Sequence, residues 1–211
     1  MGIWQMSAWQ LIVAGGPIMV PIILCSFLAL AITIEKLIYF SLIKENPKKI
    51  RATVFEAIKN NKIKEAIDLC EESASPVAKV LQAGLLRFGS PKEEIKEALN
   101  DTSQFEIPKL ERRLTALATI AQISPLLGLL GTVTGMATSF QTIQVRATSM
   151  NPVTPGDLAG GIWEALLTTV AGLMVAIPTY VIYNYLVSRI NKFILEMERS
   201  ATELINHLTQ I

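Results

Sequence analysis

One carboxylate stands alone in a long apolar stretch of the chain. Glu164 is the only charged residue from Leu158 to Ser188. A charged carboxylate at the centre of a bilayer costs about 2.5–3.5 kcal/mol, so such groups are usually covered by partner groups or titrated along an ion pathway. The 24 residues from Ala165 to Ser188 can also cross about 36 Å as a helix, which would leave Glu164 at the outer interface. The sequence therefore predicts either a pathway carboxylate or an interfacial one.

Three threonines supply hydroxyl groups that could accompany this carboxylate. Thr168 and Thr169 follow Glu164 in the same stretch, and Thr132 lies in the preceding apolar stretch. In a helix that turns by about 100° per residue, Thr168 lies closer to the face of Glu164 than Thr169 does. The hydroxyls and the carboxylate together favour a narrow, partly polar lining that faces a pore or another helix.

Glycines at helical spacing accompany Thr132. Gly128, Gly131 and Gly135 bring small residues to one side of the same stretch, and Gly131 and Gly135 have the G-x-x-x-G spacing. Small residues at this spacing let two membrane helices approach closely. We therefore expect this face to pack against another helix.

Several other kinds of chemistry are not indicated by the residues. The sequence contains no G-x-x-x-x-G-K-[ST] loop, so nucleotide hydrolysis by this chain is not predicted. The sole histidine, His207, has no second His or Cys at ligand spacing, which favours a solvated surface histidine over a metal ligand. We expect no enzyme activity, no cofactor and no metal, so the energy source must lie elsewhere.

Composition and charge distribution predict the elements that carry these residues. The chain is 51% hydrophobic and 18% charged, with a mean hydropathy of +0.41, which favours a membrane protein over a soluble domain. No charge occurs from Met1 to Ile34 or from Leu114 to Val145. A hydrocarbon core about 30 Å thick requires about 20 apolar residues. We therefore predict three transmembrane helices, in residues 17–43, 114–143 and 158–188.

The basic residues predict the orientation of these helices. Fourteen Lys and Arg lie from Lys44 to Arg113, whereas only Arg146 lies between the second and third predicted helices. Because positively charged loops stay in the cytoplasm, residues 44–113 and 189–211 should be cytoplasmic. The amphipathic segment 1–16 and the short loop 144–157 should face outward. A net charge of +1 gives no indication of nucleic-acid binding.

The predicted cytoplasmic parts have helical patterns. The run Ser90-Pro91-Lys92-Glu93 predicts a helix with Ser90 as its N-cap, bent at Pro108. The C-terminal segment has an apolar heptad seam, formed by Ile190, Ile194, Met197, Ala201, Leu204, Leu208 and Ile211. This seam either packs within the subunit or mediates self-association. The predicted fold is an all-α membrane protein, with three transmembrane helices and long cytoplasmic helical extensions.

Two membrane segments carry a resemblance to a known family. SPLLGLLGTVTGMATSF and GGIWEALLTTVAGLMVAIPTYVIYN, separated by a short outer loop, resemble the two membrane signatures of the MotA/TolQ/ExbB proton-channel family. Three spans, a cytoplasmic domain after the first and the chain length are similar to the ExbB and TolQ branch. The MotA branch is longer and has four spans.

The resemblance implies a function and partners. It implies a subunit of a pentameric helical channel in the inner membrane, surrounding single-span helices of an ExbD- or TolR-like partner whose membrane aspartate is titrated by protons. Such a motor converts the proton-motive force into work on the cell envelope, energising TonB-dependent outer-membrane transport or a Tol-type system, with a TonB- or TolA-like protein as a further partner. By motif position, Thr132 and Thr169 resemble the pore-lining threonines and Glu164 the membrane glutamate. The motif favours Thr169, whereas helical geometry alone favours Thr168.

Two other functions are compatible with a membrane protein of this size. A solute-permease subunit usually has inverted repeats and broken helices around a midplane site, and the three unlike spans show no such symmetry. A membrane scaffold has no need of a membrane carboxylate with aligned hydroxyls. The envelope process that is powered, and the choice between protons and sodium, stay open at the level of the sequence.

Overall fold

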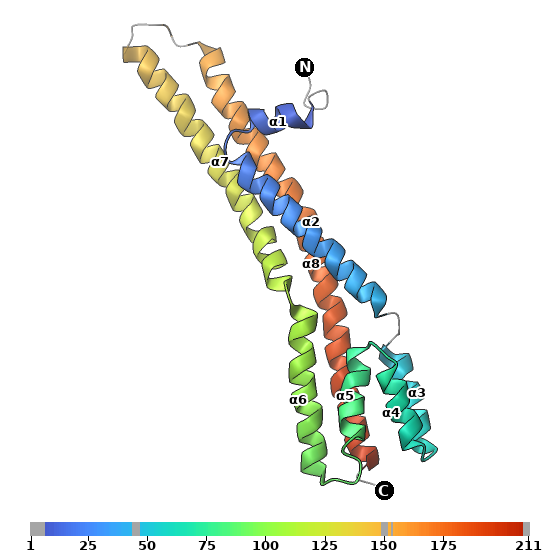
Figure 1. Cartoon of the computed structure of the whole chain (residues 1–211). Coiled ribbons are helices and arrows are strands. Elements are labelled where there is room, and N and C mark those ends of the chain that lie inside the picture. The colour runs from blue at the N-terminus through green and yellow to red at the C-terminus, as the bar shows by residue number, and fades with distance from the viewer. Residues whose placement is uncertain (1–6, 44–46, 149–151, 153, 209–211) are drawn as a thin grey trace. The chain divides into compact units, whose positions relative to one another are not determined.

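The computed structural model describes residues 7–43, 47–148, 152 and 154–208, and its regular elements are α-helices (Figure 1). Their bounds are α1 Ala8–Ala14, α2 Met19–Leu42, α3 Pro47–Lys59, α4 Ile63–Glu71, α5 Pro76–Leu85, α6 Lys92–Glu111, α7 Leu114–Thr148 and α8 Pro155–Leu208. The chain consists of two compact units. Unit 1 comprises residues 1–33 and 115–183, and unit 2 comprises residues 34–114 and 184–211. The predicted all-α architecture is confirmed.

Three of the helices contain stretches that are long and apolar enough to cross a membrane. These stretches lie in α2, α7 and α8, which are the regions where the sequence has its uncharged runs. At 1.5 Å per residue, the 24 residues of α2 extend about 36 Å, which exceeds the hydrocarbon thickness. The helices are longer than the predicted spans, because α7 continues to Thr148 and α8 continues without interruption to Leu208; the limits of the spans themselves stay predictions.

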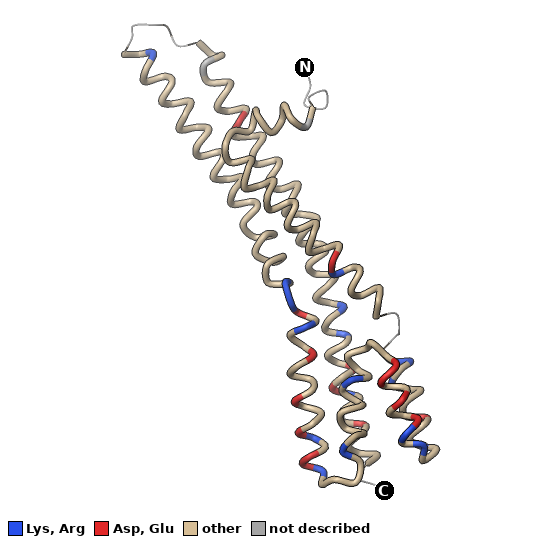
Figure 2. The backbone as a smooth tube through the Cα atoms, viewed as in Figure 1, with Lys and Arg blue, Asp and Glu red and all other residues tan. Residues whose placement is uncertain are grey.

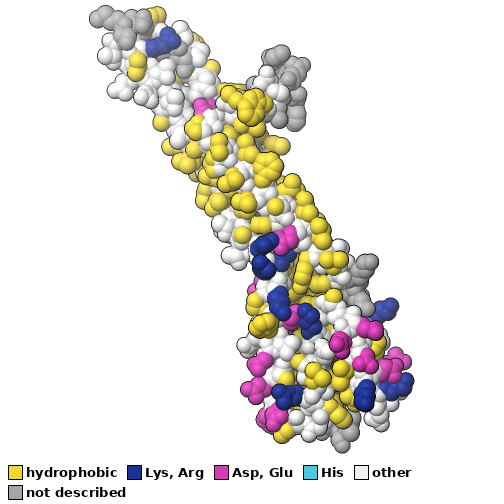
Figure 3. All heavy atoms as spheres, in the orientation of Figure 1, with side chains coloured by type: hydrophobic (Ala, Val, Ile, Leu, Met, Phe, Trp, Pro, Cys, Tyr) yellow, Lys and Arg dark blue, Asp and Glu magenta, His cyan; other side chains and the backbone are white. Residues whose placement is uncertain are grey.

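Unit 1 buries small side chains and exposes large apolar ones. Ala29, Ala165 and Ala176 are buried, whereas Phe27 and Met174 are 68% and 71% exposed. Figure 2 shows almost no charged residue along this unit, and hydrophobic side chains cover much of its visible face in Figure 3. A soluble unit would bury its large apolar side chains, because water disfavours their exposure. The pattern is therefore typical of helices that contact lipid or other membrane helices and approach one another through small residues.

Unit 2 has a core of large apolar side chains. Helices α3 to α6 pack in sequence order, with α5 in contact with both α4 and α6. Because it is covered on several sides, α5 is buried at most of its positions, including Val77, Val80 and Leu81. Gly84 of α5 lies against Leu204 and Leu99, so α5 also contacts α8 within this unit. This is the packing expected of a water-exposed helical domain.

The C-terminal part of α8 buries its apolar seam within the same chain. Phe193 stacks on Phe40 of α2, with ring centroids 6.1 Å apart, and Met197 and Leu204 are buried. The seam thus packs within the subunit against α2 and α5, whereas its predicted packing on the cytoplasmic part of the second predicted membrane helix, and self-association, stay predictions. The expected solvated position of His207 is wrong, because its ring is partly buried 5.5 Å from the ring of Phe55.

One local prediction near α6 is corrected by the structure. The helix begins at Lys92 with Pro91 as N-cap, and no side chain caps it; the N–H of Ser90 instead donates to the carbonyl of Arg87 in the preceding turn. Pro108 lies inside α6, and the bend expected there stays a prediction; the helix ends at Glu111. Arg113 has a φ of 66° and pairs with Glu35 of α2. The helix has already ended at this point, because its C-cap Arg112 has a ψ of 130°, and the left-handed Arg113 cannot resume a right-handed helix.

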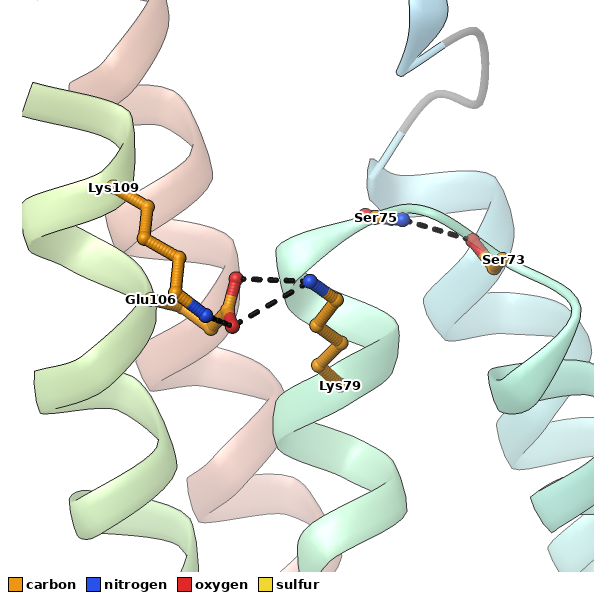
Figure 4. A network of polar contacts seen from close by, with 5 residues as sticks. All are labelled: Ser73, Ser75, Lys79, Glu106 and Lys109. Atoms are coloured by element: carbon orange, nitrogen blue, oxygen red, sulfur yellow. Dashed lines mark hydrogen bonds and ion pairs between the residues drawn. The ribbon is translucent and has the colours of Figure 1, made fainter. Parts of the chain in front are cut away.

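A buried carboxylate joins α5 and α6 within unit 2 (Figure 4). The side chain of Glu106 is 6% exposed and lies between the ammonium groups of Lys79, 3.3 Å away, and Lys109, 2.6 Å away. Nearby, the N–H of Ser75 donates to the hydroxyl of Ser73 before α5 begins. Removing a carboxylate from water is costly unless it is paired, and the two lysines supply that pairing.

Candidate functional site

Helices α7 and α8 approach each other within unit 1 through the three glycines of α7. A Cβ added at Gly128 would lie 3.0 Å from the Cα of Thr169, and one added at Gly131 would overlap the side chain of Thr168. A Cβ added at Gly135 would lie 2.6 Å from the carbonyl oxygen of Gly161. Each glycine therefore meets α8 where a larger residue would push the helices apart.

Helix α8 contributes small residues of its own, which the sequence analysis missed. A Cβ added at Gly172 would lie 2.5 Å from the carbonyl oxygen of Ser124, and one at Gly161 would overlap the hydroxyl of Ser139. Gly161, Ala165 and Gly172 recur at spacings of four and seven residues on α8. This spacing of small residues is the signal that could have identified the α8 face.

Thr168 lies inside this helix contact. Its side chain is fully buried, and its hydroxyl donates to the carbonyl oxygen of Ala165, 2.8 Å away in the preceding turn of α8. Gly131 of α7 leaves the space that the threonine occupies. Thr168 therefore fills the α7–α8 contact in this chain and has no surface toward solvent or lipid.

Thr169 is placed differently from its neighbour. It is partly exposed, and its hydroxyl donates to the carbonyl oxygen of Gly128 in α7, 3.1 Å away. A second acceptor, the carbonyl oxygen of Ala165, lies at 3.3 Å. Thr169 thus joins the two helices by a polar contact while part of its surface stays available to another molecule.

Thr132 is partly exposed on α7. Its hydroxyl donates to the carbonyl oxygen of Leu129, 2.6 Å away in its own helix. The Thr132 hydroxyl can turn to another acceptor without leaving the carbonyl oxygen of Leu129 unpaired, because a carbonyl oxygen has two lone pairs and can accept from a second donor. Thr132, Thr168, Thr169 and Glu164 all belong to unit 1.

Glu164 lies where α8 meets the turn between α1 and α2. The side chain is partly buried, and a Cβ added at Gly16 would overlap its Oε1 atom and lie 2.7 Å from its Cδ atom. Across the part of the chain that the structure describes, no hydrogen bond or ion pair reaches this carboxylate. The contact with the turn was not foreseen; the pair Gly15-Gly16 before Pro17 was its only sign in the sequence.

The site's one acidic side chain is the carboxylate of Glu164. In the described ranges, no three His, Cys, Asp or Glu side chains gather at metal-binding distance. The structure brings Thr168 and Thr169 against the glycines of α7 and brings Glu164 against Gly16. Among the described residues, the hydroxyls of Thr132 and Thr169 donate to backbone carbonyl oxygens and not to the carboxylate of Glu164. A lone carboxylate in an otherwise uncharged stretch can take up and release a proton, which is the chemistry that these residues support.

Comparisons with known proteins relate this site to a family. The profile of the MotA/TolQ/ExbB proton channel family matches residues 72–199. An ExbB-like protein of Synechocystis sp. is 34% identical over 171 residues, which cover 81% of this chain and 80% of the relative. The biopolymer transport protein ExbB of Salmonella typhimurium is 33% identical over 191 residues, covering 83% and 74% of the two chains. The Tol-Pal system protein TolQ of Haemophilus influenzae is 40% identical over 95 residues, covering 44% and 40%. The matched range includes α7 and the part of α8 that carries Glu164 and Thr169.

Proposed function

Because the chain belongs to the MotA/TolQ/ExbB proton channel family, we propose that it is the channel subunit of an ExbB- or TolQ-type complex that uses the proton-motive force to work on the cell envelope. It is a multi-pass membrane protein with three candidate spans. Members of this family are channel subunits and not enzymes. Relatives named for biopolymer transport and for the Tol-Pal system support work on the envelope as the output.

The proposal is carried by one observation, the isolated carboxylate of Glu164 in an otherwise uncharged stretch of α8. No charged group pairs with it in the described chain, although a charge within a membrane is costly without a partner. We assign Glu164 to the proton pathway on this ground.

The threonines take different roles in this proposal. Thr169 and Thr132 keep partly exposed hydroxyls and line the pathway beside Glu164. Thr168 is enclosed between α7 and α8, which favours a packing role together with Gly128, Gly131 and Gly135. The buried position of Thr168 therefore supports the motif-based choice of Thr169.

The proposed assembly is a pentamer with a single-span ExbD- or TolR-like partner that carries a membrane aspartate. Three helices of one chain are too few to enclose a polar pathway and cover Glu164 from lipid. Exposed apolar side chains on both α7 and α8, such as Leu126 and Leu166, offer surfaces for neighbouring subunits. A TonB- or TolA-like protein would then transmit the work to the outer membrane.

The proposed location is the inner membrane, with the N-terminus outside and the C-terminus in the cytoplasm. The excess of Lys and Arg from Lys44 to Arg113, against Arg146 alone on the other side, supports this orientation. Unit 2 contains the charged helices α3 to α6 and would be cytoplasmic. Protons would enter from the side of α1.

The test is a Glu164→Gln variant, which keeps the size of the side chain and removes its charge. We expect normal assembly with the partner but loss of proton-gradient-dependent work, measured in cells or in proteoliposomes with an imposed pH gradient. Glu203→Gln, which changes a partly exposed carboxylate of α8 in unit 2, is the matched control and should retain activity. Full activity of Glu164→Gln would remove the residue from the pathway, and failure to assemble would make it structural.

Native mass spectrometry of the detergent-solubilised chain tests the proposed stoichiometry. A five-subunit species, with or without the partner, is the expected result. A monomer that still supports proton-driven work with its partner would contradict the proposal. Such a monomer would also leave unexplained how Glu164 is covered from lipid.

A further inference from the structure

The short connection between α1 and α2 has a backbone conformation that favours glycine. Helix α1 ends at Gly15, whose N–H donates to the carbonyl oxygen of Leu11, 3.0 Å away. Gly16 follows with a φ of 67°, in the left-handed region that glycine adopts without steric cost. The chain then enters α2 at Met19, whose N–H donates to the carbonyl oxygen of Gly16.

Gly16 is also the position that meets the membrane carboxylate. The three atoms closest to a Cβ added there all belong to Glu164, namely Oε1, Cδ and Cγ. A side chain at position 16 is disfavoured by the backbone angle, and it would also displace the flexible end of the Glu164 side chain. At Gly15, an added Cβ would likewise meet a flexible side chain, that of Met19.

Helix α1 precedes this turn and is capped at its own N-terminus. Ser7 caps the helix through a reciprocal capping box with Gln10, which fixes the first turn of a short helix. Trp9 and Val13 are exposed, and tryptophan prefers the boundary between lipid and water. These features are typical of a helix that lies along the membrane surface and fixes the turn in place.

We infer that the turn at Gly15 and Gly16 covers the carboxylate of Glu164 and restricts its access to water, with Gly16 as the positioning residue. The inference rests on the proposed function for the role of Glu164 and for the outward location of α1. The absence of a side chain at Gly16 lets the backbone lie directly on the carboxylate. A side chain at this position would move the carboxylate away from the turn and expose it.

Chemical labelling of Glu164 measures this cover directly. The complete complex, in lipid nanodiscs that leave both faces accessible, is treated with a water-soluble carbodiimide and an amine, and labelling at each carboxylate is followed by peptide mass spectrometry. Glu94, an exposed carboxylate of α6, is the internal reference in every sample. Gly16→Ala adds both strain and a side chain, whereas Gly16→Asn adds a side chain that tolerates a positive φ. Gly160→Ala, at a position with open space around it, is the matched control.

In the unchanged chain, we expect Glu164 to be labelled at least about tenfold more slowly than Glu94, as for a group that reacts only after local opening. Labelling of Glu164 should rise several-fold in Gly16→Asn and Gly16→Ala and stay unchanged in Gly160→Ala. Equal labelling of Glu164 and Glu94 in the unchanged chain would overturn the inference, even if neither Gly16 variant assembles. Unchanged labelling in an assembled Gly16 variant would also overturn it.

The same samples separate this inference from the proposed function. If Glu164→Gln retains proton-driven work while the labelling contrast persists, the cover stands and the pathway role of Glu164 fails. If Glu164→Gln loses work but Glu164 is labelled as readily as Glu94, the pathway role stands and the cover fails.

Discussion

The hydroxyl of Thr169 in α8 donates to the carbonyl oxygen of Gly128 in α7 across 3.1 Å. The adjacent Thr168 makes no such link, since its hydroxyl donates to carbonyl oxygens within α8, and its side chain fills the space left by Gly131. Two neighbouring residues of one type therefore contribute in different ways. One joins the helices through a polar contact that remains partly exposed, and the other packs them together.

Replacing Thr169 with valine should weaken proton-driven work without preventing assembly. The change exchanges a hydroxyl for a methyl group at nearly constant volume and removes one hydrogen bond between helices, worth about 0.6 kcal/mol in a membrane protein. Thr169→Ser retains the donor and should keep most of the activity. The measurement is proton-gradient-dependent work at equal amounts of complex.

Thr168→Val serves as the comparison for Thr169→Val. It removes only bonds to backbone oxygens of α8 and keeps the shape that packs on Gly131, so we expect nearly normal work and stability. A loss of work in Thr168→Val that exceeds the loss in Thr169→Val would reverse the roles assigned to the two threonines.

A bulky residue at Gly131 should disrupt the folding of unit 1 within each subunit. Gly131→Leu would force a side chain into the position of Thr168, whereas Gly160→Leu adds the same side chain where nothing lies within 4 Å. Overpacking of this kind separates helices that approach through small residues. We expect Gly131→Leu, but not Gly160→Leu, to lower the amount of folded protein. The measurement is the yield of monodisperse complex in detergent. Similar yields for the two variants would argue against the α7–α8 contact.

Glu106 and its two lysines should behave as a coupled group. Lys79→Met and Lys109→Met each leave one ammonium on the carboxylate, so each single change should have a modest effect. The double change leaves a nearly buried carboxylate without a partner, a situation that costs about 3–5 kcal/mol. We expect the double variant to lose more thermal stability than the two single variants combined. Additive losses in thermal unfolding would contradict this coupling.

Cys70 should make stability decrease at high pH. Burial raises the pKa of its thiol from the ordinary 9.0 to about 12, so between these values the unfolded chain loses a proton that the folded chain retains. Unfolding therefore becomes more favourable as the pH rises through this window, whereas below pH 9 the contribution of Cys70 to stability is constant. The difference in thermal unfolding temperature between the unchanged chain and Cys70→Ala, measured from pH 8 to pH 11, isolates this residue from other groups. A difference that does not change with pH would contradict the shift.

The sequence alone was sufficient to predict three long apolar helices and the charged residue within the third of them. Both can be read from the sequence without coordinates. The length of an uncharged run shows whether it can cross a bilayer, and Glu164 is the only charged residue in its run. The glycines of α7 likewise predict close helix packing without coordinates, because their spacing places them on one face. The family profile matches residues 72–199, which include both α7 and the part of α8 that carries Glu164.

The tertiary structure decided which groups these residues meet. Helical periodicity placed Thr168 near the face of Glu164, but it contains no information on which face α7 covers, and the structure buries Thr168 against Gly131. The contact of Gly16 with Glu164 joins residues far apart in the chain, and no local pattern specifies such a pair. The ion pair between Arg113, after the end of α6, and Glu35 of α2 likewise joins residues that are distant in the sequence. Local sequence determines which helices form, whereas these contacts depend on how the helices pack.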